Sequence, residues 1–348
     1  MRVLTVVGAR PQFIKAALVS PRLREVAQEV LVHTGQHYDY ELSELFFAEL
    51  ALPQPDHLLG VGSAPASVQT AAILERLHPV LVQERPDAVV VYGDTNSTLA
   101  GALAAAQANI PLAHVEAGLR SYDRTMPEEI NRVLTDHLAQ ALYCPTAAAV
   151  ENLRREGIVE GVVLTGDVME AALARAHPSP DLLQPYAVEP GGYFLATVHR
   201  QANADSPERL RGILAGLGRL SAPVLLPLHP RTRERIARFG LDVPANIRLL
   251  PPQGYRAMIS LERYARAVLT DSGGVQREAA WLGVPVYVLR QRTEWTELVE
   301  SGQAVLVGTD PERIVTAVEE GWARPQATAG RPDPVEAIVA DLGARWGK

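Results

Sequence analysis

Short apolar runs rich in valine, leucine and isoleucine alternate along the chain with longer segments of helical periodicity. In the first half, the runs predict strands over residues 2–7, 29–34, 87–92, 110–115, 141–144 and 162–165. The segments near and between them predict helices over residues 11–25, 38–50, 64–84, 96–108, 127–139 and 147–156. The second half predicts strands over residues 193–198, 223–228, 246–250, 267–270, 285–289 and 304–307. Such alternation is typical of parallel α/β units.

A segment rich in proline and glycine, HPSPDLLQPYAVEPGG at residues 177–192, interrupts this pattern. Its composition indicates a connection between folded parts, and 348 residues are more than one ordinary core holds. We therefore predict two doubly wound, Rossmann-like domains, the first over residues 1–175 and the second over residues 186–330, with an inter-domain cleft.

The residues that follow the predicted strands are unusually polar. The segments are GARPQFIK (8–15), TGQHYD (34–39), GDTNST (93–98), HVEAGLR (114–120), TGD (165–167), TVHRQAN (197–203), PLHPRT (227–232), LLPPQGY (249–255) and TDSGGVQRE (270–278). In open α/β sheets, ligands bind outside the carboxyl ends of the strands. We expect the chemistry of the protein at these ends.

One of these segments has the form of an anion site. Ser272, Gly273 and Gly274 lie between an apolar strand and a predicted helix, where backbone N–H groups and the helix N-terminus favour negative charge. Glu278, one turn later, is placed to accept hydrogen bonds from a vicinal diol such as ribose. The chain has neither a Walker loop nor a dinucleotide fingerprint, so a nicotinamide cofactor is unsupported, and a nucleoside diphosphate bound without a kinase-type loop remains open.

Basic residues gather at the same strand ends, although the chain carries a net charge of −7 that argues against a nucleic-acid binder. They are Arg10, Lys15, Arg120, Arg132, His199, Arg200, His229 and Arg231. Lys15 is one of only two lysines in the chain, and the other is Lys348. Converging cations of this kind favour an anionic substrate.

Carboxylates form a third set. Asp94 and Glu116 follow predicted strands, and Glu128 with Glu129 opens a predicted helix. Acids among cations are candidates for proton transfer, while capping of a helix N-terminus remains the alternative for Asp94 and Glu128. No clustered ligand spacing indicates a metal.

Composition and the N-terminal residues bear on the location and the partners of the protein. A single cysteine, Cys144, excludes a disulfide framework. The N-terminus reads as a strand rather than a signal peptide, and no run of about 18 apolar residues indicates a membrane helix. We therefore expect a cytoplasmic protein without a membrane or nucleic-acid partner.

Taken together, seven of these segments resemble the non-hydrolysing UDP-N-acetylglucosamine 2-epimerases. They are GARPQFIK, GDTNSTLA, HVEAGLRSYD, MPEEINR, TVHRQAN, PLHPRT and LTDSGGVQREA, in the order of that family, and the resemblance runs from residue 2 to about residue 308. It implies the two-domain glycosyltransferase-B fold, with a last helix in residues 331–348 that packs back on the N-terminal domain.

The resemblance implies interconversion of UDP-GlcNAc and UDP-ManNAc by elimination of UDP to 2-acetamidoglucal and its re-addition. It also implies a homodimer, no cofactor, and a role in supplying cell-surface polysaccharide synthesis. The residues similar to the family's catalytic groups are Asp94, Glu116, Glu128, His199 and Lys15. Those similar to its UDP-sugar ligands are Arg10, Arg132, His229, Gln253, Tyr255, Ser272, Gly273, Gly274 and Glu278.

Two departures leave alternatives open. The stretch Gln36-His37-Tyr38-Asp39 keeps only the first two residues of the family's substrate-activation motif, which puts such activation in doubt. The forms GARPQFIK, HTGQHYD and QRTEWTELVESG also look like the branch that acts on UDP-2,3-diacetamido-2,3-dideoxyglucuronate, whose extra carboxylate an arginine such as Arg124, Arg290 or Arg292 would bind.

Functions of other classes are a glycosyltransferase of the same architecture, a UDP-sugar binder without activity, and a hydrolysing epimerase. Three candidate carboxylates favour the epimerase over a transferase, which needs one base for its acceptor.

Overall fold

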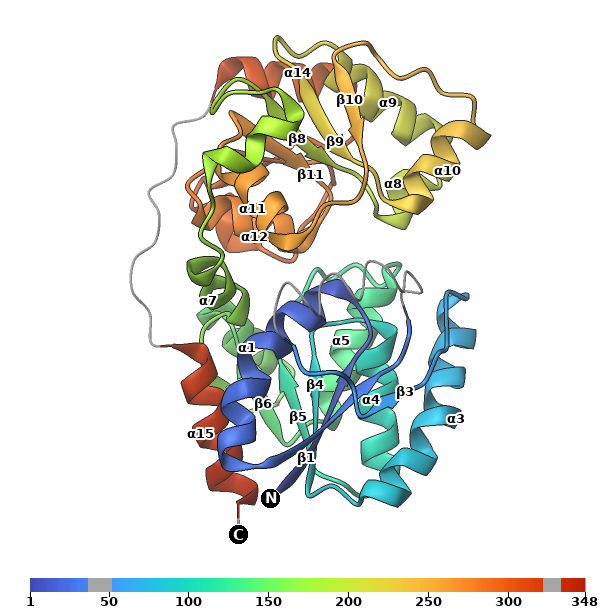
Figure 1. Cartoon of the computed structure of the whole chain (residues 1–348), viewed down its shortest axis with the longest axis vertical. Coiled ribbons are helices and arrows are strands. Elements are labelled where there is room, and N and C mark those ends of the chain that lie inside the picture. The colour runs from blue at the N-terminus through green and yellow to red at the C-terminus, as the bar shows by residue number, and fades with distance from the viewer. Residues whose placement is uncertain (37–51, 322–332, 348) are drawn as a thin grey trace. The chain divides into compact units, whose positions relative to one another are not determined.

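The computed structural model describes residues 1–36, 52–321 and 333–347, so the predicted helix at 38–50 and the residues His37, Tyr38 and Asp39 lie outside the described residues. The chain forms two compact units, both of which are drawn in Figure 1. Unit 1 comprises Met1–Arg175 and Gly330–Lys348, and unit 2 comprises Ala176–Ala329.

The described part of unit 1 is built on a parallel sheet of seven strands. In spatial order they are β3 (His57–Leu58), β2 (Gln28–His33), β1 (Arg2–Val7), β4 (Ala88–Tyr92), β5 (Leu112–Val115), β6 (Ala141–Cys144) and β7 (Val162–Leu164). Its helices are α1 (Arg10–Val26), α3 (Ala66–Glu84), α4 (Asn96–Gln107), α5 (Pro127–Leu138), α6 (Ala147–Arg155), α7 (Val168–Arg175) and α15 (Pro334–Trp346). The strand order reverses between β1 and β4.

Alternating strand residues face two separate cores, as expected for a sheet covered on both sides. Val3 and Val7 of β1 pack with α1 and α15, whereas Leu4 and Val6 pack with α3 and α4. Helix α15, which comes last in the chain, contacts α1 and α7 (Figure 1).

Unit 2 repeats the design, with six parallel strands among its described residues. In spatial order they are β10 (Ile247–Leu250), β9 (Val224–Pro227), β8 (Phe194–Thr197), β11 (Ala267–Thr270), β12 (Val286–Val288) and β13 (Ala304–Leu306). Its helices are the 3₁₀ helix η1 (Pro180–Tyr186), α8 (Gln201–Ala204), α9 (Pro207–Gly218), α10 (Pro230–Arg238), α11 (Tyr255–Arg263), α12 (Gly273–Trp281), α13 (Thr296–Glu300) and α14 (Pro311–Glu320). Here the order reverses between β8 and β11.

Local sequence explains where the helices begin. Thr95 and Ser272 each accept a hydrogen bond from a backbone N–H of the helix they precede. Pro127, at the start of α5, fits a position that needs no N–H donor. Pro111 likewise explains why β5 starts two residues later than predicted, because proline cannot donate to a strand ladder.

Candidate active site

The turn between β1 and α1 is closed by Gln12. Its Oε1 accepts hydrogen bonds from the N–H groups of Gly8 (2.8 Å) and Ala9 (3.0 Å), and its Nε2 donates to the Tyr92 carbonyl at 2.8 Å. Gly8 has no room for a side chain, because a Cβ there would lie 2.1 Å from Thr34 Oγ1. This turn fixes the first helix against the end of β4 and directs Lys15 into the interior, where it is 3 % exposed.

Glu116, directly after β5, forms an ion pair with Lys15. Its φ of +73° is left-handed, a conformation that is costly for a residue other than glycine and is often held at functional sites. The N–H groups of Glu116 and Ala117 both donate to the Tyr143 carbonyl, at 3.1 and 3.0 Å. A Cβ at Gly93 would lie 3.4 Å from Glu116 Oε1 and 3.7 Å from Lys15 Nζ, so the ends of β4 and β5 meet at this ion pair.

The charges of three carboxylates act on the Lys15 ammonium group. Burial raises the pKa of Glu116, Lys15 opposes the shift, and the charges of Asp167 and Asp94 add to it. Burial also acts to lower the pKa of Lys15, but Glu116, Asp167 and Asp94 outweigh it and raise the pKa. Lys15 therefore stays charged, while Glu116 keeps a proton to higher pH than an exposed glutamate does.

A second ion pair joins Asp94 to Arg132, whose Nη1 also donates to Glu129 Oε2 at 3.2 Å. The capping alternative for Asp94 is wrong, since α4 is capped by the next residue, Thr95. Glu128 is half-buried in the first turn of α5, where an acid is favoured by the helix dipole.

Glu129, rather than Glu128, is the buried acid at the start of α5. Its carboxylate accepts hydrogen bonds from Ser121 N and Oγ (both 2.9 Å) and from Tyr122 N (2.8 Å), besides Arg132. It thus fixes both the loop after β5 and the guanidinium that contacts Asp94.

In unit 2 the ends of β8 and β11 are joined by Asp271. Its carboxylate accepts hydrogen bonds from the backbone N–H groups of His199 (3.0 Å) and Arg200 (3.1 Å) and from Asn203 Nδ2 (3.0 Å). The rings of His199 and His229 lie 6.0 Å apart. Desolvation of the ring, together with His199 and Arg231, lowers the pKa of His229 to about 4. Because the residue as a whole is exposed, solvent screening reduces this lowering.

The predicted anion loop begins α12. Ser272 is the N-cap, and the first N–H groups of a helix have no partner within it. Gly273 is packed so closely that a Cβ would lie 2.1 Å from Glu294 Oε1, and its carbonyl accepts from Trp295 Nε1 at 2.9 Å. Gly274 is exposed, so this face of the helix N-terminus is open.

The other predicted UDP-sugar ligands lie on α1, on α12, at the start of α11 and in the loop before α11. Glu278 is buried on α12, Tyr255 is buried at the start of α11, and Gln253 contacts the Tyr186 hydroxyl and donates to the Pro251 carbonyl at 2.6 Å. Arg10, in unit 1, is half-buried at the start of α1.

The arginines considered for an extra substrate carboxylate differ. Arg290 donates to Glu294 Oε2 at 2.8 Å, whereas Arg124 and Arg292 are exposed. In the stretch compared with the family's activation motif, Gln36 is buried and its Oε1 accepts from Ser97 N at 2.9 Å, so this residue braces the start of α4.

Gln12, Asp167 and Asp271 were not singled out from the sequence, and Glu129 was named only beside Glu128. Asp167 and Asp271 lie in the segments TGD and TDSGG, so the strand-end rule contained the signal for both. Glu129 binds the loop after β5 and Gln12 donates to the Tyr92 carbonyl, and only the tertiary structure reveals those contacts.

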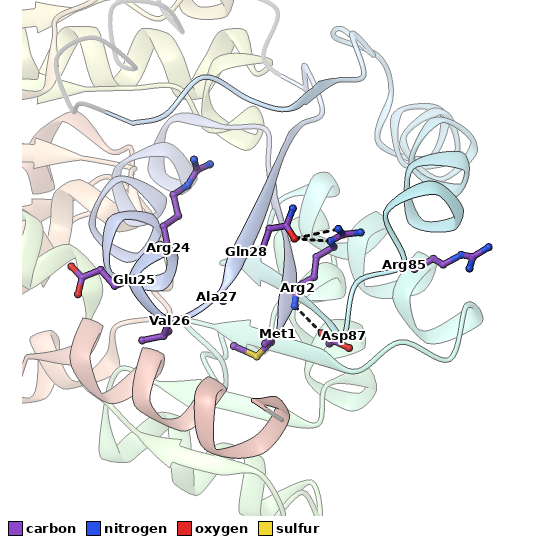
Figure 2. A pocket seen from close by; sticks show the side chains of 9 residues that line it. All are labelled: Met1, Arg2, Arg24, Glu25, Val26, Ala27, Gln28, Arg85 and Asp87. Carbon is purple, nitrogen blue, oxygen red and sulfur yellow. Dashed lines mark hydrogen bonds between the residues drawn. The ribbon is translucent and has the colours of Figure 1, made fainter.

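A hollow of about 670 Å³ lies at the amino-terminal end of the strands of the first sheet (Figure 2). Among its lining residues, Arg2 and Gln28 begin β1 and β2, and Asp87 directly precedes β4. It is therefore remote from the strand ends that carry the candidate residues. Within residues 1–36, 52–321 and 333–347, no group of His, Cys, Asp and Glu side chains is placed to hold a metal ion. No described helix is long and apolar enough to cross a membrane.

The chain is similar to proteins of one known family. A family profile described as UDP-N-acetylglucosamine 2-epimerase matches residues 22–334. A "UDP-N-acetylglucosamine 2-epimerase homolog" of Methanococcus maripaludis is 46% identical over 92% of each chain. The UDP-2,3-diacetamido-2,3-dideoxy-D-glucuronate 2-epimerase of Pseudomonas aeruginosa is also 46% identical, over 90% of each chain.

The same family appears among solved structures. The crystal structure of the Methanocaldococcus jannaschii UDP-GlcNAc 2-epimerase in complex with UDP-GlcNAc and UDP has a TM-score of 0.92 and 39% sequence identity. The match covers 99% of this chain and 100% of that one. These findings confirm the predicted resemblance, the glycosyltransferase-B-like α/β fold and the class of enzyme, an isomerase. The chain belongs to the UDP-N-acetylglucosamine 2-epimerase family.

Proposed function

We propose that the protein interconverts UDP-GlcNAc and UDP-ManNAc without hydrolysing them. Family membership supports the reaction class, and the relative from M. jannaschii supports the substrate. The observation that carries the proposal is the pair of carboxylate–cation contacts, Lys15 with Glu116 and Asp94 with Arg132, where β1, β4 and β5 end.

The reaction must invert C2 of a sugar whose C2–H bond is not acidified by a neighbouring carbonyl. In the proposed sequence, a carboxylate takes the C2 proton, a C1–C2 double bond forms, and the C1–O bond to UDP breaks. The products held at that stage are UDP and 2-acetamidoglucal. Protonation of C2 from the other face and attack of UDP on C1 complete the epimerisation.

Unit 1 supplies the groups that move protons in this proposal. Glu116 is suited to donate a proton, because burial with Asp167 and Asp94 raises its pKa. Lys15 keeps its positive charge beside it and stabilises negative charge that develops on the leaving diphosphate. Asp94 and Glu128 are the candidate proton acceptors.

Unit 2 supplies the groups that hold UDP. The N-terminus of α12 at Ser272, Gly273 and Gly274 binds the diphosphate, and Glu278 binds the ribose. Asp271 orients the backbone at His199, which acts near the diphosphate. Gln253 and Tyr255 contact the uracil, while Arg10 of unit 1 and His229 add contacts to the phosphates.

A second substrate is favoured by one observation. The P. aeruginosa relative, named for UDP-2,3-diacetamido-2,3-dideoxy-D-glucuronate, is as similar as the M. maripaludis homolog. The extra carboxylate of that substrate requires a cation besides those that bind the diphosphate. Of the three arginines considered for it, Arg124 and Arg292 are exposed, and Arg290 is paired with Glu294.

Incubation of the protein with each substrate in D2O tests the proposal. We expect UDP-ManNAc with deuterium at C2 from UDP-GlcNAc, and traces of UDP. Exchange with the diacetamido-uronate alone would establish the second substrate. Free ManNAc as the product, or no C2 exchange with either substrate, would contradict both.

We further propose a cytoplasmic homodimer that supplies cell-surface polysaccharide synthesis, which rests on the family resemblance. Sedimentation equilibrium of the purified chain tests the dimer, and a monomer at all concentrations would refute it.

A further inference from the structure

A buried network of charged side chains lies behind the loops that carry Asp94 and Glu116. His114, on β5, is 0 % exposed, and Asp136, on α5, is 1 % exposed. The Nδ1 atom of His114 lies 2.7 Å from Asp136 Oδ1, and its Nε2 atom lies 2.7 Å from the Gly93 carbonyl oxygen. The ring therefore bridges helix α5 and the loop after β4.

The hydrogen-bond inventory fixes the protons of this ring. A carbonyl oxygen only accepts, so Nε2 must carry a hydrogen to bond Gly93. The second nitrogen faces a carboxylate whose other oxygen, Asp136 Oδ2, accepts from Arg120 Nη1 (2.7 Å) and Gly118 N (3.1 Å). Contact with the Arg120 guanidinium favours the ionised form of Asp136, so the hydrogen of the Nδ1–Oδ1 bond belongs to Nδ1.

The charges around Asp136 agree with this. Burial acts to raise the pKa of Asp136, but His114 and Arg120 outweigh it and lower the pKa. Arg120 is shared with Glu156, which accepts from Nε and Nη2 at 2.7 and 2.8 Å, and Glu156 Oε2 also lies 3.0 Å from Nε2 of the exposed His137. The buried Asp136 thus has Arg120 at Oδ2 and His114 at Oδ1, and an ionised carboxylate in such a site is costly without cations beside it.

The network ends on the loops of the candidate active site. Gly93 precedes Asp94 and has a φ of +62°, and its Cα faces the Lys15–Glu116 pair. Asp136 accepts a hydrogen bond from the N–H of Gly118, which lies two residues after Glu116. The φ of Gly118 is +80°. Both loops thus have left-handed turns that the buried His114–Asp136 pair supports.

We propose that His114 is a positioning residue: its doubly protonated ring braces ionised Asp136 against the Gly93 carbonyl and so places Asp94 beside the Lys15–Glu116 pair. The effect of His114 on turnover rests on the proposed function, whereas the protonation of its ring does not.

Nitrogen-15 NMR of the histidine rings tests the protonation directly. In the wild-type protein at pH 7, we expect one ring with a hydrogen on both nitrogens and a scalar coupling from Nε2 to the Gly93 carbonyl carbon. Loss of that signal in His114→Gln assigns it. A His114 ring with one hydrogen, or without the coupling to Gly93, would overturn the proposal even if no variant folds.

Two variants separate the two hydrogen bonds. Glutamine places its amide near the position of Nε2 and keeps the donor to Gly93, whereas asparagine places its amide near Nδ1 and keeps only the donor to Asp136. We expect His114→Asn to lower kcat about tenfold more than His114→Gln, because misplaced catalytic groups are costly, while KM changes little in both. His78→Gln, at an exposed position of α3, is the matched control.

Equal kcat values for the two folded variants, or a lower value for His114→Gln, would refute the positioning role. An inactive wild-type protein would instead refute the proposed function, and the NMR result would stand on its own.

Discussion

Units 1 and 2 each place polar residues where the strand order of a parallel sheet reverses, but they use different chemistry there. In unit 1, beyond β1, β4 and β5, the groups are side chains in partly buried ion pairs, Lys15 with Glu116 and Asp94 with Arg132. In unit 2, at β8 and β11, the start of α12 offers backbone N–H groups, and Asp271 holds the adjoining backbone.

The difference follows from what each unit must do. Backbone N–H groups carry no titratable proton, so they bind an anion equally well at any pH near neutrality. Proton transfer requires a group that gains and loses a proton; burial and the neighbouring carboxylates raise the pKa of Glu116, which suits the role proposed for it. We therefore expect changes in unit 1 to alter kcat and changes in unit 2 to alter UDP affinity.

The largest effect is expected from Glu116→Gln. The amide cannot donate a carboxyl proton, so kcat should fall by about 10²-fold or more, while UDP affinity stays unchanged. Steady-state kinetics and calorimetric titration with UDP measure the two quantities. Glu160→Gln, on an exposed residue of the same unit, is the control, and near-normal turnover of the Glu116 variant would remove this residue from the mechanism.

Lys15→Arg keeps the charge but enlarges a buried side chain. Overpacking a core site costs about 1–3 kcal/mol, which corresponds to a decrease of roughly tenfold to a hundredfold in kcat if it falls on the transition state. Thermal unfolding of the variant shows whether the fold is intact. Full activity in an intact fold would mean that any cation serves beside Glu116.

Gly273→Ala is the corresponding change in unit 2. Its Cβ would lie 2.1 Å from Glu294 Oε1, so the start of α12 must move. We expect UDP to bind about tenfold more weakly, a loss of about 1.4 kcal/mol, with a smaller effect on kcat at saturation. Gly343→Ala, where a Cβ would meet nothing within 4 Å, is the control. Unchanged UDP affinity in the Gly273 variant would separate this loop from the diphosphate.

Asp167→Asn should have the smallest effect on the maximal rate. Asp167 raises the pKa of Glu116, so its neutralisation lowers that pKa. If Glu116 acts as the acid, its protonated form is then lost at lower pH, and the basic limb of the kcat profile shifts to lower pH. Glu160→Gln, which also neutralises a carboxylate of unit 1, is the control and should leave the limb in place. An unshifted limb in the Asp167 variant would show that Asp167 does not tune the pKa of Glu116.

The sequence predicted the strand ends well because their signal is local. An apolar run followed by GDT or DSGG marks both the strand and the polar group after it, and β4 and β11 lie within a residue of their predicted ranges. Strand β3, His57–Leu58, was missed, since two residues carry no periodicity. The contacts of Glu129, His114 and Asp271 were also missed, because each binds segments that lie at other points in the chain.

The path of the chain has a consequence for how the protein is made. Unit 2 is one continuous stretch inserted into unit 1. Val335, Ile338, Val339 and Leu342 of α15 complete the core around α1. During synthesis, Lys15 and Glu116 therefore leave the ribosome early, yet the core that supports them is complete only when residues 333–347 have emerged. All residues of unit 2 are synthesised before residues 333–347, so we expect unit 2 to finish folding before unit 1. This reverses the usual order, in which the domain that begins nearer the N-terminus folds first.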